Sequence, residues 1–168
     1  MTTKLSAMRF TLIDRVCLLE PGVRIVAVKN LSLAEEYLAD HFPGFPVMPG
    51  VLMLEAMTQA AAWLIRVGED FAHSTVILKE AKNVKYANFV EPGQTLTVTA
   101  EITAQQEREV HFKARGEVDG VQMVSARLLL ARYNLADDDP RRAETDQVIV
   151  QELRKLLALL YRPATQVV

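Results

Sequence analysis

His41 and Glu55 are the two side chains of this sequence whose types and surroundings best fit proton-transfer chemistry. Glu55 lies inside a long apolar run, where a carboxylate is rare unless it is paired or functional. Gln59 follows one helical turn later, so the two side chains would share a face and Gln59 would orient the carboxyl. A histidine held near a buried glutamate is a candidate pair for general acid and base catalysis.

Plainer interpretations of both residues stay open. Glu55 needs no functional role if it lies at an exposed end of its helix, or if it pairs with an arginine such as Arg66 or Arg15. A lone histidine is more often structural than catalytic. The feature that favours the acid–base interpretation is the stiff loop in which His41 lies.

The elements that must position this pair are a loop and a helix. Residues 41–50 hold three prolines and two glycines, so they form neither a helix nor a paired strand. The segment from about 51 to 66 contains no proline or glycine and consists mostly of good helix formers. It is apolar on nearly every side, which predicts a buried helix.

The rest of the chain to about residue 133 is typical of strands joined by tight turns. Two Glu-Pro-Gly turns, at 20–22 and 91–93, and an Asp-Gly pair at 119–120 mark chain reversals. A short helical turn precedes the loop, with Ser32 as its cap and Glu35 as the capping-box partner. We expect this turn over about 33–39 and strands over 9–19, 23–30, 75–89, 95–104, 110–118 and 121–133.

These elements predict an α+β fold, in which an antiparallel sheet of about five or six strands packs on one central helix. The helix is too apolar to lie on an open sheet with one side in water. The sheet must therefore curl around the helix, or a second subunit must cover it.

Composition limits the compartment and the class of partner. The chain has 168 residues, half of them hydrophobic, which suits one domain with a substantial core. A net charge of -2 argues against non-specific binding of nucleic acid. Cys17 is the single cysteine, which favours a reducing compartment, the cytoplasm, and it lies in an apolar run that indicates core packing.

Several classes of segment and site are not expected. Residues 1–10 lack the apolar stretch of a secretory signal, and no apolar run reaches transmembrane length without a charge. The three histidines are far apart and no second cysteine is present, so no metal site is expected.

The end of the chain differs from the rest. Residues 137–142 are typical of a charged, proline-broken linker, and 144–161 predict an amphipathic helix. We therefore expect a domain over 1–136 and a linker with a C-terminal helix over 137–168. The helix either packs on the domain or contacts a partner or another subunit; its weakly basic polar face disfavours a membrane surface. Its apolar stripe consists of Val148, Leu153, Leu156, Leu157 and Leu160.

The stretch from His41 to Gln59 resembles the active-site motif of the 3-hydroxyacyl-[acyl-carrier-protein] dehydratases of the hot-dog fold. The matching pattern is H-F-P-x-x-P-x-M-P-G-V-L-x-x-E-A-M-x-Q, and the similarity extends over about residues 9–133. In that family an antiparallel sheet wraps a long helix. Val51 and Glu55 resemble the dedicated dehydratases, whereas relatives that also isomerise the double bond carry cysteine and aspartate at these positions.

The resemblance implies that His41 and Glu55 are the catalytic pair, which removes water from a 3-hydroxyacyl thioester to give the trans-2-enoyl thioester. His41 would take the C2 proton, since neutral imidazole is a base near neutral pH. Glu55 would serve as the acid that protonates the leaving hydroxyl, directly or through a water. The Gly50 N–H would stabilise the enolate oxygen. Val51 and Gln59 complete the substrate-binding residues, and no metal or redox cofactor is needed.

The resemblance also implies partners. The acyl chain arrives on the phosphopantetheine arm of an acyl carrier protein, and we expect this acidic protein to dock on Lys79, Lys82 and Lys85. An ordinary solvated strand face is the alternative for these lysines. The family builds each site at a dimer interface, with the histidine from one subunit and the glutamate from the other. A homodimer or a trimer of dimers is therefore expected.

Two positions depart from the family's pattern. Asp40 precedes the histidine where the family usually has glycine, and Phe45 stands in a loop position that is usually polar. The Asp40 carboxylate either acts on the His41 imidazole or simply faces solvent, and Phe45 would reshape the site entrance. These departures bear on substrate length, carrier preference and oligomer geometry. The same fold hosts acyl thioesterases and non-catalytic acyl-carrier-binding subunits. The motif spacing favours the dehydratase, and a non-catalytic subunit would be expected to lose His41 or Glu55.

Overall fold

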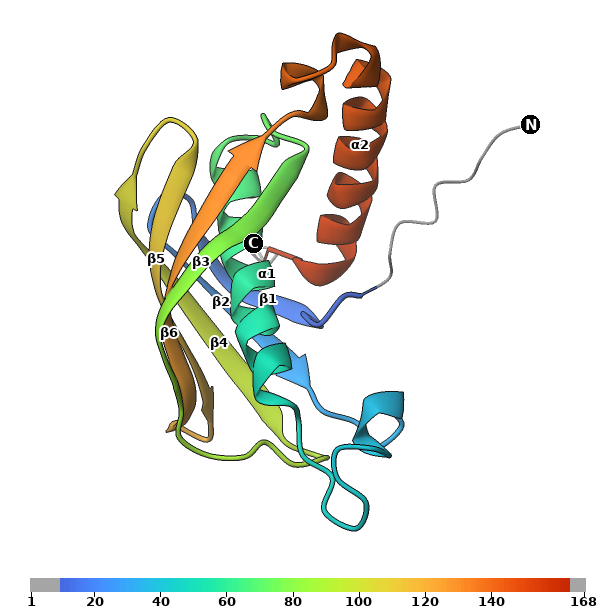
Figure 1. Ribbon diagram of the computed structural model, residues 1–168, viewed down its shortest axis with the longest axis vertical. Helices are drawn as coiled ribbons and strands as arrows, with labels where there is room; N and C mark the ends of the chain where they lie inside the picture. Colours follow the sequence, from blue (N-terminus) through green and yellow to red (C-terminus); the bar gives the residue numbers. More distant parts are fainter. Residues whose placement is uncertain (1–9, 164–168) are drawn as a thin grey trace, which may run out of the picture.

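Six antiparallel strands form a curved sheet with a long helix against one face in the computed structural model, which describes residues 10–163 (Figure 1). The strands lie in the order β1-β2-β4-β5-β6-β3, so β1 and β3 are the edges. The strands are β1 (Arg15–Glu20), β2 (Arg24–Asn30), β3 (Thr75–Tyr86), β4 (Thr95–Gln105), β5 (Glu109–Val118) and β6 (Val121–Tyr133). This arrangement confirms the expected α+β fold.

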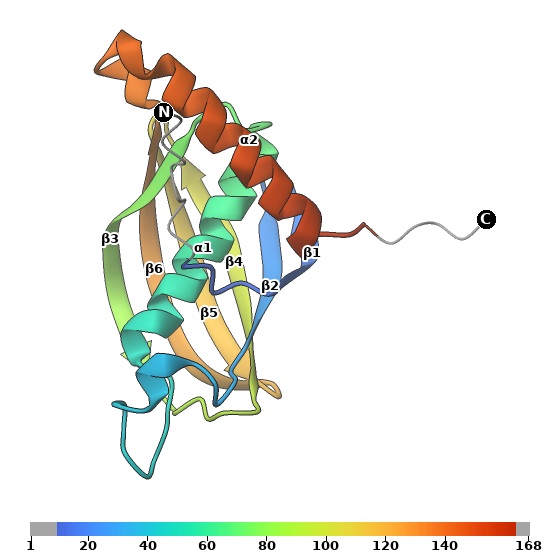
Figure 2. The same cartoon turned by 90° about the vertical axis from the view of Figure 1, so that its right-hand side faces the viewer.

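Two α-helices and three short 3-10 helices complete the chain. The central helix α1 follows the proline-rich loop, and α2 follows the last strand (Figure 2). The helices are η1 (Glu36–Leu38), α1 (Gly50–Gly68), η2 (Leu135–Asp137), η3 (Pro140–Arg142) and α2 (Ala143–Leu160).

The core lies between α1 and the sheet face that it covers. Side chains alternate along each strand, so every second residue points toward the helix. On β2 these residues are Ile25, Ala27 and Lys29, all of them buried. The sheet-facing side of α1 carries small residues such as Ala56 and Ala60, which are fully buried and let the strands approach closely. Each large apolar side chain buried here contributes roughly 1.5–3 kcal/mol before entropy is subtracted.

α1 is buried mainly on its sheet side. The helix begins directly after Pro49, whose carbonyl accepts the N–H groups of Leu52 and Met53. On the side away from the sheet, Val51 is 65% exposed and Glu55 is partly buried. The prediction of a helix buried all round is therefore wrong for the first turns in a single chain. By length and composition alone α1 could cross a membrane, but 56% of its most apolar window is buried inside the fold.

The first strand is shorter than expected. β1 begins at Arg15, and the residues just before it, including the buried Leu12, run across α1 instead of along the sheet. Arg9, the expected start of this strand, lies outside the described residues, as do 1–8. Cys17 is exposed, so its interpretation as core packing is wrong. Val16 points to the core, and Cys17 is the unpaired residue of a β-bulge in the pairing of β1 with β2.

α2 packs on the surface of the same chain, beside β1 and the end of α1 (Figure 2). Leu160 is 6% exposed and belongs to the main core. Val148 is 40% exposed, so its place in the predicted stripe is wrong; Val150 packs against the core in its stead. The remaining predicted leucines pack as expected, at spacings of three and four residues that define one helix face.

Asp146 fastens the first turns of α2 to the rest of the fold. Its carboxylate accepts a hydrogen bond from the Ser74 hydroxyl and one each from the Leu135 and Ala136 N–H groups, at 2.9 Å. Asp146 is only 7% exposed. Burial raises the pKa of Asp146, but these hydrogen bonds together outweigh burial and leave the pKa below its ordinary value. The docked position of α2 therefore depends on an ionised carboxylate.

Candidate active site

His41 is held from both sides by hydrogen bonds. Its N–H donates to the Tyr37 carbonyl at 3.1 Å, and its carbonyl accepts the Val47 N–H at 3.0 Å. Its ring nitrogen Nδ1 lies 2.9 Å from the Val47 carbonyl oxygen. A carbonyl oxygen can only accept, so Nδ1 carries the hydrogen in this contact. The other nitrogen, Nε2, is then the basic atom of the neutral imidazole.

His41 lines a cavity of about 610 Å³ at the start of α1. Gly50 and Val51 line it from the helix, and Tyr86 and Phe89 line it from the end of β3 and the loop that follows. Apolar walls around one imidazole and one helix terminus are the usual composition of a small-molecule site. Three of the residues predicted from the sequence, His41, Gly50 and Val51, are therefore brought together.

Gly50 combines close packing with a free backbone donor. A Cβ atom added at Gly50 would lie 2.9 Å from Cε1 of Tyr86, so the ring can approach this closely only because the residue is glycine. Gly50 is also the first residue of α1, and the first N–H groups of a helix have no partner within it. The positive end of the helix dipole lies at the same point. This end of the cavity is suited to a developing negative charge.

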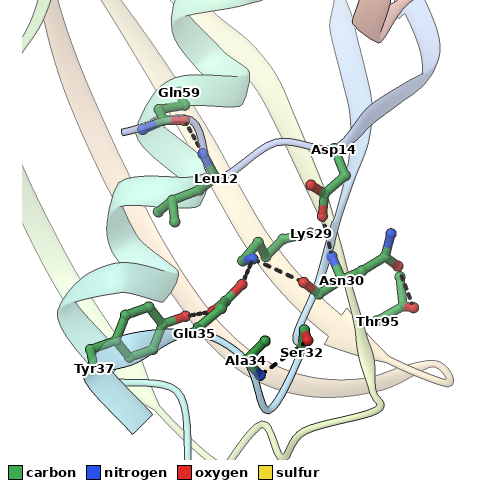
Figure 3. Close-up of polar contacts among 10 residues, drawn as sticks. All are labelled: Leu12, Asp14, Lys29, Asn30, Ser32, Ala34, Glu35, Tyr37, Gln59 and Thr95. Atoms are coloured by element: carbon green, nitrogen blue, oxygen red, sulfur yellow. Dashed lines mark hydrogen bonds and ion pairs between the residues drawn. The ribbon is translucent and has the colours of Figure 1, made fainter. Parts of the chain in front are cut away.

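Glu55 and Gln59 form a second cluster, further along α1. The Nε2 of Gln59 donates to Oε1 of Glu55 at 3.0 Å, as their spacing predicted. The same amide donates to the Phe10 carbonyl at 2.8 Å. Its oxygen accepts the Leu12 N–H at 2.9 Å (Figure 3). Gln59 therefore ties the start of the described chain to the helical turn that carries Glu55.

One chain does not bring His41 and Glu55 into the same cavity. Glu55 is absent from the walls of the His41 cavity, although Val51, one turn before it, is part of them. The alternative ion pair of Glu55 with Arg66 or Arg15 is not formed within residues 10–163. Arg66 instead lies over the ring of Trp63 with its Cζ 5.2 Å from the ring centroid, and burial lowers the pKa of Arg66 to about 10.

Exposed aromatic rings surround the entrance of the cavity. Phe42 stacks on the His41 ring, with centroids 4.0 Å apart. Phe45 contacts Phe89 edge to face at a centroid distance of 5.7 Å, and the two side chains are 47% and 62% exposed. The unusual Phe45 therefore lies at the entrance. Asp40 is exposed and forms no hydrogen bond or ion pair with His41 in the described part of the chain.

Sequence reasoning missed a partly buried polar network beside the loop. Glu35 is not the capping-box partner of Ser32, because its carboxylate pairs with Lys29 and with the Tyr37 hydroxyl (Figure 3). The Ser32 hydroxyl accepts the Ala34 N–H at 3.2 Å instead. The signal that could have revealed the network is Lys29 itself, a lysine at a core-facing position of an alternating strand.

The predicted docking lysines lie away from the His41 cavity. Lys79 pairs with a glutamate of β5, and Lys82 with a neighbouring glutamate of β3 at 3.2 Å. Lys82 and Lys85 line grooves on the sheet face opposite α1. There the strand register places Lys82 beside Arg127, and Arg127 beside Lys113. These two further cations were not singled out in the sequence.

A comparison with protein families identifies the family to which this chain belongs. Residues 5–127 match the FabA-like domain family, and this span covers most of the sequence. The chain therefore belongs to the FabA-like family.

Individual relatives define the type within that family. The chain is 41% identical over 111 residues to the 3-hydroxyacyl-[acyl-carrier-protein] dehydratase FabZ of Ruminiclostridium cellulolyticum, covering 66% of this chain and 78% of that one. It is 40% identical over 123 residues to FabZ of Thiobacillus denitrificans, covering 71% and 85%. The resemblance to the dedicated dehydratases is confirmed.

Solved structures confirm the hot-dog fold. The dehydratase heterocomplex ApeI:P from Xenorhabdus doucetiae is similar with a TM-score of 0.62 at 19% identity, covering 75% of this chain and 85% of that one. A hypothetical thioesterase from Streptococcus pneumoniae TIGR4, solved with coenzyme A, is similar with a TM-score of 0.52 at 10% identity, covering 70% and 84%. At these identities the likeness concerns the fold alone.

Proposed function

We propose that this chain is a 3-hydroxyacyl-[acyl-carrier-protein] dehydratase of fatty acid or related lipid biosynthesis. The observation that carries the proposal is that His41 and the N-terminus of α1 line the same cavity. The chain is also 40% identical over 123 residues to a dehydratase of that name. The reaction removes a proton from C2 and the hydroxyl from C3, so that water leaves and a trans-2-enoyl thioester remains.

His41 is the proposed base. Its Nδ1 is occupied by the Val47 carbonyl, which leaves Nε2 to take the C2 proton. Removal of this proton moves negative charge onto the thioester oxygen. The Gly50 N–H and the helix dipole behind it stabilise this charge, and the absence of a side chain at Gly50 lets the thioester approach. Val51 forms the adjoining wall of the cavity.

Glu55 is the proposed acid, which gives a proton to the leaving hydroxyl. Gln59 orients it through the 3.0 Å hydrogen bond. Because Glu55 does not line the cavity of its own His41, we assign it to the site of a second subunit. Each site of a homodimer would then combine His41 and Gly50 of one chain with Glu55 of the other.

Two surfaces support a dimer. β3 is an edge strand of 12 residues, and its free edge can pair with another strand. The open side of the first turns of α1, where Val51 is 65% exposed, is a second surface for a partner to cover. A trimer of dimers is a larger assembly compatible with this pairing.

The substrate is proposed to arrive on an acyl carrier protein that docks on Lys79, Lys82 and Lys85. The row of cations formed by Lys82, Arg127 and Lys113 extends this surface; Lys82 is paired with a glutamate of β3, whereas Arg127 and Lys113 form no ion pair within residues 10–163. The variant K82E/K85E should raise the KM for a carrier-bound substrate, most strongly at low salt. It should leave a small pantetheine thioester unaffected. K155E, on α2, is the matched control.

The domain division and the compartment belong to the same proposal. Residues 1–136 would carry the chemistry, and 137–168 would serve stability or assembly. A chain with a single exposed cysteine suits the reducing cytoplasm, where carrier-dependent lipid synthesis is expected.

A direct assay tests the function. The protein is incubated with 3-hydroxyacyl carrier-protein substrates of several lengths, and the enoyl product and free thiol are followed separately. Enoyl product without thiol is the expected result. Release of free thiol would identify a thioesterase, and neither product would indicate a non-catalytic acyl-binding subunit.

A further inference from the structure

Lys29 occupies a position that the fold reserves for apolar side chains. It follows Ile25 and Ala27 on the core-facing side of β2 and is only 5% exposed. A buried ammonium group is costly unless it is paired and hydrogen-bonded. Lys29 Nζ donates to the Asn30 carbonyl at 2.9 Å and forms an ion pair with the Glu35 carboxylate (Figure 3).

Glu35 joins this lysine to the turn that precedes the active-site loop. One carboxylate oxygen accepts from Lys29, and the other accepts from the Tyr37 hydroxyl (Figure 3). Tyr37 lies in η1, whereas Lys29 lies in the sheet. The network therefore connects a rigid strand to a short 3-10 helix through one carboxylate.

Tyr37 connects the network to His41. Its carbonyl accepts the His41 N–H at 3.1 Å, so the tyrosine binds the histidine through its backbone and Glu35 through its side chain. The only fully buried side chain of η1 is Leu38, and the residues around it are mostly exposed. The turn is therefore attached by the buried Leu38, by the partly buried Tyr37 ring against the core, and by this polar network to β2.

We propose that Lys29, Glu35 and Tyr37 are positioning residues that fix His41 for proton abstraction. The proposal rests on the proposed function, in which His41 is the base. Val47 holds the histidine from the side of α1, and the network holds it from the side of β2. A displacement of about 1 Å in such a group can lower a rate about 100-fold, which is why a second attachment matters.

The experiment separates positioning from stability by three variants. Y37F removes only the hydroxyl and keeps the ring and the carbonyl that holds His41. K29M leaves the partly buried Glu35 carboxylate without its cation. The double variant K29M/E35L replaces the ion pair by apolar side chains of similar size, which is often neutral for stability. R24M is the control, because Arg24 lies on the same strand as Lys29 and its ion pair with Glu20 of β1 is exposed.

The melting temperature of each variant is measured first. Its kcat and KM are then measured with the 3-hydroxybutyryl thioester of N-acetylcysteamine, a substrate that needs no carrier docking. We expect kcat to fall about tenfold in Y37F and in K29M/E35L at unchanged KM, although the double variant melts close to the wild type. R24M should behave as the wild type. A double variant with wild-type kcat, or kcat losses that follow melting temperature alone, would overturn the positioning role. Wild-type protein that forms no enoyl product would instead contradict the proposed function, and this inference with it.

Discussion

Gln59 donates a hydrogen bond to Glu55 one turn away on α1, while the same amide group is bonded to the backbone of the segment that precedes β1. A single side chain thus controls both the orientation of the candidate acid and the path of the first described residues. The variant Q59E keeps an acceptor for the Leu12 N–H but loses both donated bonds and puts a second carboxyl beside Glu55.

We expect Q59E to lower kcat about 10- to 100-fold with little change in KM, because the proposed acid loses its orientation. Q59L should also destabilise the protein by about 1–3 kcal/mol, since the Leu12 N–H would lose its acceptor in a buried position. Steady-state kinetics and urea unfolding measure the two effects. Wild-type kcat in a folded Q59E protein would show that Gln59 serves the chain path alone.

The contact between Gly50 and Tyr86 makes a steric prediction. A methyl group at position 50 would lie 2.9 Å from the Tyr86 ring, which is half exposed and can move. G50A should therefore fold with a loss of at most about 1 kcal/mol, but it should lower kcat/KM about tenfold because the ring or the methyl group fills the cavity. The double variant G50A/Y86A should recover part of the activity. No recovery would mean that the glycine acts through something other than this contact.

Asp146 predicts an acid-sensitive attachment of α2. Its pKa is depressed in the folded protein, so its contribution to the free energy of unfolding is full above its unfolded pKa of about 3.9 and is lost as the pH falls below that value. D146N should lower stability at pH 7 by about 1–3 kcal/mol and flatten the decline below about pH 4. Urea midpoints at pH 7 and in acid measure this. D139N, at a less buried carboxylate paired with Arg141, should change far less.

α2 offers two neighbouring leucines as a matched pair. Leu160 is 6% exposed in the core, whereas Leu159 is 71% exposed. L160A should destabilise the protein by about 2–5 kcal/mol and L159A by no more than about 0.5 kcal/mol. Both should keep dehydratase activity while folded, because α2 makes no contact with the His41 cavity. Equal melting temperatures for the two variants would show that the helix is not docked in solution.

Local patterns were the most predictable part of this chain. The spacing of Glu55 and Gln59 predicted their contact, and the proline-rich loop predicted a fixed His41, because both depend on residues close in sequence. What failed depends on tertiary packing. Cys17 lies at a β-bulge that the sequence pattern does not reveal, and the Glu35 carboxylate pairs with a buried lysine of another element instead of capping its own helical turn.

The separation of His41 and Glu55 in the folded chain is a second feature that the sequence pattern could not predict. Motif spacing brings them close in sequence, yet the helix carries Glu55 one turn beyond the wall of the cavity. No local rule states which chain supplies the acid to a given histidine. That question belongs to the arrangement of two copies, about which a single sequence is informative only through resemblance.

The most direct test of the account is complementation between two inactive variants. H41A and E55Q are purified, each confirmed as folded and inactive, and mixed in equal amounts under conditions that exchange subunits. If each site takes His41 from one chain and Glu55 from the other, half of the dimers are mixed and each holds one intact site. About a quarter of the wild-type activity should then return. No recovery, in a mixture whose subunit exchange is verified by mass, would contradict a shared site built from these two residues.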